Sequence, residues 1–180
     1  IVTFKPDTTI FTDINEYNYD ILASRLRELS FLNKGITMTL VDRRDKDKKS
    51  GEFQSEIFFS KEGLPEFIKF LDGSREPIMR NVIAFEGEKN GVPVEVAMIY
   101  NTSYAENLHS YVNNINTHEG GTHLSGFRRG LTHTLKKYSE ASGMLDKLKF
   151  EISGDDFREG LTAIISVKVA EPQFEGQTKT

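Results

Sequence analysis

Apolar residues recur every three or four positions in three segments of the chain, and this spacing predicts three amphipathic helices. The first runs from residues 15–18 to Asn33 and stops before Gly35, the second covers 64–71, and the third runs from Thr122 to about Ser142. The apolar face of the third helix consists of Leu124, Phe127, Leu131, Leu135 and Tyr138.

Between these helices, apolar and β-branched runs predict strands. The expected strands cover 2–4, 36–41, 53–59, 82–88, 92–100 and 161–169, and the segment 104–115 is expected to extend their sheet. Asn90-Gly91 separates two of these runs and supplies the positive φ angles of a tight hairpin turn. Helices mixed with largely antiparallel strands predict an α+β fold.

Composition limits the possible classes of function. The 180 residues include 37% hydrophobic and 28% charged residues, which is typical of a globular protein, and no apolar run reaches the length of a membrane helix. A net charge of −4 means that any binding of nucleic acid must come from a local patch. The chain has no cysteine and no signal peptide, so we expect a cytoplasmic protein, and because it opens on Ile1 we expect a piece of a longer one.

The sequence contains few candidates for a metal-binding, catalytic or anion-binding site. His118 and His123 have no Asp or Glu at ligand spacing, so we predict no metal site. Asp155-Asp156 is typical of a capped helix start, because neighbouring side chains point apart and do not form a catalytic pair. At Gly120-Gly121 the long helix begins; Thr122 is expected to cap it, and an anion site at its free N–H groups is the alternative.

The long helix carries an unusually basic face for an acidic chain. Arg129, His133, Lys136 and Lys137 lie opposite its apolar stripe, and Arg128 flanks the stripe. Such a face is a candidate track for a phosphate backbone, but an ordinary solvated face explains the sequence pattern equally well.

Four motifs together resemble the DNA gyrase B family, which supplies the ATPase of type IIA topoisomerases. They are RELSFLNKG at 27–35, YVNNINTHEGGTH at 111–123, DFREGLTA at 156–163 and PQFEGQTKT at 172–180. The resemblance implies that residues 1–45 are the last strand–helix–strand of a GHKL-type ATPase domain and that 46–52 form a charged linker. Residues 53–180 would be a transducer domain with the left-handed β-α-β crossover of GHMP kinases, a rare connection.

The resemblance also implies roles for individual residues. A Gln and a Lys of the transducer meet the γ-phosphate of ATP in the family, and Gln177 and Lys179 match them, which makes them the expected catalytic and cofactor-binding residues. A basic residue on the long helix faces the cavity for the transported duplex, and Arg128 matches it. We expect a DNA-facing set of Arg128, Arg129, Lys136 and Lys137.

The family's Mg²⁺-binding Asn, its catalytic Glu and its ATP lid precede the part that this chain resembles. ATP and Mg²⁺ are therefore expected in the full-length protein, and this piece alone is expected to be inactive. The implied partners are DNA, the DNA gyrase A protein in a heterotetramer and a second copy on ATP binding, with no membrane. Two alternatives remain: the corresponding ATPase protein of topoisomerase IV, in which decatenation dominates, and a stand-alone binding module of the same fold.

Overall fold

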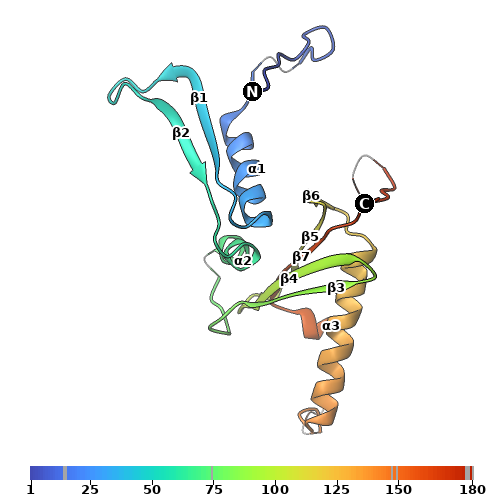
Figure 1. Cartoon of the computed structure of the whole chain (residues 1–180). Coiled ribbons are helices and arrows are strands. Elements are labelled where there is room, and N and C mark those ends of the chain that lie inside the picture. Colours follow the sequence, from blue (N-terminus) through green and yellow to red (C-terminus); the bar gives the residue numbers. More distant parts are fainter. Residues whose placement is uncertain (14–15, 74, 147, 149, 177–178, 180) are drawn as a thin grey trace. The chain divides into compact units, whose positions relative to one another are not determined.

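A computed structural model of the chain describes residues 1–13, 16–73, 75–146, 148, 150–176 and 179. The chain forms two compact units, Ile1–Lys61 and Glu62–Thr180, and each is described by itself (Figure 1). None of the described helices is long and apolar enough to cross a bilayer.

The first unit consists of α1 (Tyr19–Leu32) and an antiparallel hairpin of β1 (Met38–Lys46) and β2 (Phe53–Phe58). The Asn18 side chain caps α1 by accepting a hydrogen bond from the N–H of Ile21 at 3.1 Å. Arg27 of α1 forms an ion pair with Glu56 of β2, and its guanidinium lies 5.5 Å from the centre of the Phe58 ring. The predicted helix and both strands of this hairpin are thus confirmed.

Two expectations for the first unit differ from the structure. The strand at 2–4 is wrong: the described residues 1–13 form no strand, and Val2 and Phe4 are exposed. The charged segment 46–52, expected as a linker, is the turn of the hairpin, where Asp47 accepts hydrogen bonds from the N–H groups of Lys49 and Ser50. The two compact units separate between Lys61 and Glu62, so β2 lies in the first.

The second unit is built on a five-stranded sheet with the order β3-β4-β7-β5-β6. Its strands are β3 (Ile83–Lys89), β4 (Val92–Tyr100), β5 (Asn107–Val112), β6 (Ile115–Asn116) and β7 (Leu161–Val167). The β3–β4 hairpin turns at Asn90 and Gly91, whose φ angles of 53° and 76° confirm the predicted turn. β7 pairs antiparallel with β4 and parallel with β5.

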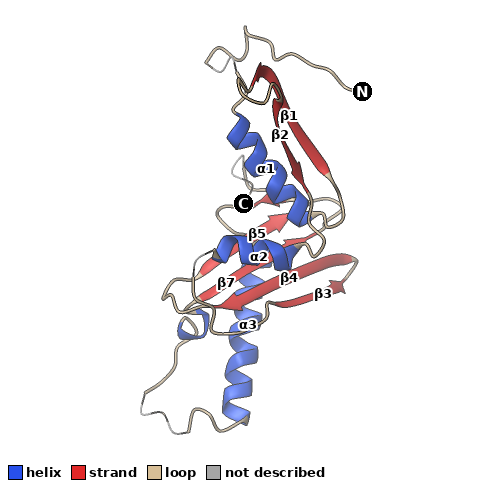
Figure 2. Cartoon of the chain, turned by 90° about the vertical axis from the view of Figure 1, so that its left-hand side faces the viewer, coloured by secondary structure: helices blue, strands red, loops and turns tan. Residues whose placement is uncertain are grey.

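Two helices cover opposite faces of this sheet (Figure 2). α2 (Leu64–Asp72) packs on the face where Phe67 meets Tyr111, with ring centres 6.1 Å apart. α3 (Thr122–Ala141) packs on the other face, where Leu124 joins Val112 and Val167 in a buried cluster. All seven residues of β7 are buried because the strand is central and covered on both sides.

The parallel pair β5 and β7 is connected through α3, as the predicted β-α-β crossover requires. The α+β class is confirmed, and the left-handed sense of the crossover stays a prediction. A short 3-10 helix, η1 (Asp156–Arg158), precedes β7 and contacts α3.

Candidate nucleic-acid interface

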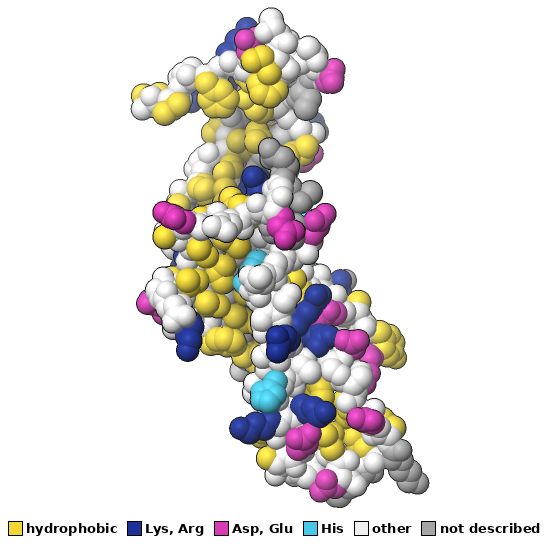
Figure 3. Space-filling view, turned by 90° about the vertical axis from the view of Figure 1, so that its right-hand side faces the viewer, with side chains coloured by type: hydrophobic (Ala, Val, Ile, Leu, Met, Phe, Trp, Pro, Cys, Tyr) yellow, Lys and Arg dark blue, Asp and Glu magenta, His cyan; other side chains and the backbone are white. Residues whose placement is uncertain are grey.

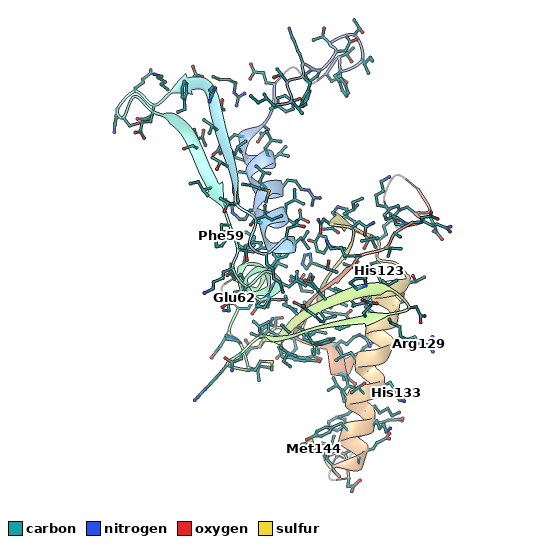
Figure 4. All side chains as sticks on the ribbon, viewed as in Figure 1. Phe59, Glu62, His123, Arg129, His133 and Met144 are labelled. Carbon is teal, nitrogen blue, oxygen red and sulfur yellow. The ribbon has the colours of Figure 1, made fainter. Side chains whose placement is uncertain are left out.

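α3 positions the basic side chains that the sequence singled out. Leu124 at its start is buried, whereas Tyr138 near its end is 63% exposed, so the helix leaves the sheet toward its C-terminal end. Arg129, His133, Lys136 and Lys137 are exposed, and none of the four forms an ion pair with a described residue. Figure 4 shows Arg129 and His133 on the side of α3 turned away from the strands.

A shallow groove follows this basic face. Figure 3 shows Lys, Arg and His side chains exposed on one face of the molecule, with acidic side chains between some of them. Most of the lining of the groove comes from α3, and Arg158 of η1 completes it; the residues are Ser125, Arg128, Arg129, Gly130, Thr132, His133, Lys136 and Arg158. Lys137, the fourth member of the expected set, lies outside this lining. The structure thus brings three of the four expected DNA-facing residues to one groove.

Arg128 differs from the other basic residues of α3 because it is half-buried and paired. Its Nη2 donates to Glu106 Oε2 at 3.0 Å, and its Nε lies 3.3 Å from Glu106 Oε1. The same carboxylate accepts a hydrogen bond of 2.9 Å from Arg158 Nε. One acidic side chain therefore holds two arginines of the groove.

Arg158 is fixed more firmly than Arg128. Its Nη1 donates to Thr132 Oγ1 at 2.6 Å and to the Gly154 carbonyl at 2.9 Å, and Asp155 pairs with its remaining nitrogen. Its side chain is 15% exposed, against 42% for Arg128. Sequence reasoning missed both Glu106 and Arg158, because no spacing rule relates residues that lie on different elements.

The start of α3 is built differently from the expectation. Gly121 is the N-cap, with no side-chain capping bond, and Thr122 is already the first helical residue, so the predicted Thr122 cap is wrong. The Nε2 atom of His123 lies 3.3 Å from Thr117 Oγ1. Burial lowers the pKa of the His123 imidazole. Within the described ranges no group of three or more His, Asp or Glu could hold a metal ion.

Asp155 and Asp156 have structural roles, but the predicted capped helix start is wrong: Asp155 is the N-cap of the three-residue η1 and makes no side-chain capping bond. Asp156 accepts hydrogen bonds from the N–H and the hydroxyl of Ser153 at 2.7 and 2.8 Å, and these bonds lower the pKa of its carboxyl. Asp155 pairs with Arg158. The two carboxylates therefore serve different partners and do not form an acid–base pair.

The C-terminal tail carries the residues expected to meet ATP. The ammonium of Lys179 lies 5.5 Å from the centre of the Phe174 ring, and Phe174 packs against the buried cluster under α3. Lys179 is half-buried and adopts a φ of 58°. Gln177, its expected companion, lies outside the described residues.

Comparisons with known proteins bear on the whole chain. The family model for DNA gyrase B matches residues 63–180. The chain belongs to the DNA gyrase B family. It is 63% identical to the DNA gyrase B protein of Cytophaga hutchinsonii and 53% identical to that of Chitinophaga japonensis, covering 99% and 98% of this chain and 37% of each relative.

Solved structures agree with this family. The 43K ATPase domain of Thermus thermophilus gyrase B, solved in complex with an aminocoumarin, matches with a TM-score of 0.79 and 32% identity, covering 96% of this chain and 45% of that one. The topoisomerase IV ATP-binding domain of Francisella tularensis shares the fold, with a TM-score of 0.69 and 23% identity over 93% of this chain and 42% of that one. The chain spans just over a third of the length of the first curated relatives that it matches.

Proposed function

We propose that this chain is the coupling part of a DNA gyrase B protein, linking ATP binding and hydrolysis to DNA strand passage and negative supercoiling. The exposed basic face of α3 in an otherwise acidic chain is the observation that carries the proposal. Three exposed cations and Arg128 along one helix suit a phosphate backbone, and the face lacks the Asn and Gln side chains that read base edges.

In this proposal the second unit, which begins at Glu62, is the transducer domain expected from residue 53 onward, and the first unit is the end of a GHKL-type ATPase domain. ATP and Mg²⁺ would bind in the full-length protein, with Gln177 and Lys179 reaching the γ-phosphate. A cation is the group that a transferring phosphoryl needs, and Lys179 lies on a segment that follows the central strand β7. The proposed partners are DNA, the DNA gyrase A protein and a second copy of gyrase B, in the cytoplasm. The relatives named as gyrase favour supercoiling over the decatenation of topoisomerase IV.

Substituting Arg128 by Gln in the complete enzyme tests the DNA-facing role. We expect the DNA concentration for half-maximal stimulation of ATP turnover to rise about fivefold, which corresponds to the loss of about 1 kcal/mol from one exposed charge contact. Lys89→Gln is the matched control, because Lys89 is an exposed cation of the same unit that lies on the β3–β4 hairpin and not on α3. An Arg128→Gln enzyme that responds to DNA like the control would contradict the proposal.

A further inference from the structure

We infer that Glu106 is a regulatory residue of the proposed DNA-binding groove. It forms an ion pair with Arg128 in the absence of DNA, and it weakens the binding of a DNA phosphate to Arg128. The inference rests on the proposed function and concerns a residue that neither the motifs nor the helix pattern pointed to. It is built from the contacts of one carboxylate with two arginines.

The contacts show that Arg158 is held in place and that Arg128 is available to a ligand. Arg158 donates to Glu106, Thr132 and Gly154 and also pairs with Asp155, so its position depends on several partners. Arg128 has Glu106 as its single ion-pair partner among the described residues, and its Nη1 donates no hydrogen bond to them. A competing anion can therefore take Arg128 from Glu106 without disturbing Arg158.

The local charge shows what this pairing does. Arg128 and Arg158 are balanced by Glu106 and Asp155, so this end of the groove is neutral, while Arg129, His133 and Lys136 extend along the rest of it. A phosphate that takes Arg128 from Glu106 must replace the hydrogen bonds of Arg128 to both carboxylate oxygens, and one that binds at Nη1 lies close to a like charge. Glu106 thereby lowers the affinity of the groove for the duplex. This suits a DNA segment that must bind and then dissociate.

The test uses the full-length protein assembled with the DNA gyrase A protein. Its probe is a linear duplex, and its variant is Glu106→Gln. Gln keeps the length of the side chain and an oxygen that accepts from Arg158, but it removes the charge. We expect half-maximal DNA stimulation of ATP turnover at about fivefold less DNA. We also expect the logarithmic salt dependence of that concentration to steepen by about 0.9, the value for one further phosphate contact.

Two further variants make the result specific, and the first is Asp155→Asn. This variant removes a charge on the other side of Arg158 and changes no contact of Arg128. The Asp155 side chain is 91% exposed. If Asp155→Asn acts as strongly as Glu106→Gln, net charge explains the effect and the inference is overturned. If Glu106→Gln itself is silent or weakens the response to DNA, the inference is overturned as well.

The double variant Arg128→Gln with Glu106→Gln separates this inference from the proposed function. Glu106→Gln should change nothing once Arg128 is gone, because its effect passes through that arginine. A damaging Arg128→Gln together with a silent Glu106→Gln leaves the proposed function standing and overturns the inference. A silent Arg128→Gln overturns both. Should Glu106→Gln fail to fold in a thermal melt, Glu106→Asn replaces it, because it also removes the charge and should shift the response in the same direction.

Discussion

Gly160 lies at a point where two strand ends meet with no room for a side chain. Its φ is +72°, and a Cβ built there would lie 2.4 Å from the carbonyl oxygen of Asn101 and 2.8 Å from that of Ser103. The Gly160 carbonyl accepts a hydrogen bond from the N–H of Asn101 at 2.9 Å, so the backbone cannot move aside without losing this bond.

We therefore expect Gly160→Ala to lower the free energy of unfolding by about 2–4 kcal/mol. Gly126→Ala is the control, because Gly126 lies inside α3 with nothing within 4 Å of a built Cβ and should stabilise by about 0.5–1 kcal/mol. Urea denaturation followed by circular dichroism measures both. Equal midpoints for the two variants would contradict the steric argument.

At this scale the sequence predicts some roles and misses others. Asn90-Gly91 identifies its own turn, because two neighbouring residues determine that geometry. Glu106 and Arg158 cannot be found from the sequence, since they meet Arg128 from 22 and 30 positions away, and only the fold brings them together. The cap expected at Thr122 is one residue too late because Gly121 can also begin a helix.

α3 as an element presents a charged face that no described acidic side chain neutralises beyond Arg128. Phosphate contacts act through charge alone, so removing two of them weakens binding to every duplex alike. We expect Arg129→Gln with Lys136→Gln to reduce the logarithmic salt dependence of DNA binding by about 1.8, which is about 0.9 for each contact.

Titration of the complete enzyme with two duplexes of different sequence at several salt concentrations checks this prediction. The loss of affinity should be the same for both duplexes. Unequal losses would show that the helix reads bases, and an unchanged salt dependence would show that this face is solvated and does not contact DNA.

The elements themselves are largely predictable, and their pairing is not. All three helices and the β3–β4 hairpin follow from apolar spacing, because a helix or a tight hairpin is a local structure. The placement of β5 beside β7 joins residues more than 50 positions apart, and periodicity carries no information about such a pair. Val2 and Phe4 resemble a strand in composition, but a strand also needs a partner.

At the scale of the molecule, Lys179 is the residue that would link the two proposed activities. It contacts the ring of Phe174, which is anchored in the buried cluster under α3. A γ-phosphate would draw the ammonium from that ring, and loss of the phosphate would return it. ATP binding would thereby change the contacts of Phe174 with the buried cluster on which α3 packs.

Full-length Lys179→Ala should retain binding of ADP, which lacks the γ-phosphate, and lose about 100-fold of its ATP turnover together with supercoiling. Lys89→Ala removes an exposed cation of the same unit and serves as the control. Turnover is measured with a coupled assay, and supercoiling is measured on relaxed plasmid in the presence of the DNA gyrase A protein. Turnover of Lys179→Ala within about twofold of the control would rule out this switch.

The central position of β7 has a consequence for synthesis of the chain. β5 ends at Val112 and β7 ends at Val167, 55 residues later, so at translation rates of roughly 5–20 residues per second the middle of the sheet stays vacant for roughly 3 to 11 s. During that interval β4 exposes Val96, Ala97 and Ile99, which become buried later, along an unpaired edge. We therefore expect the nascent second unit to bind chaperones that hold unfolded chains, and we expect its sheet to form only once β7 has been synthesised.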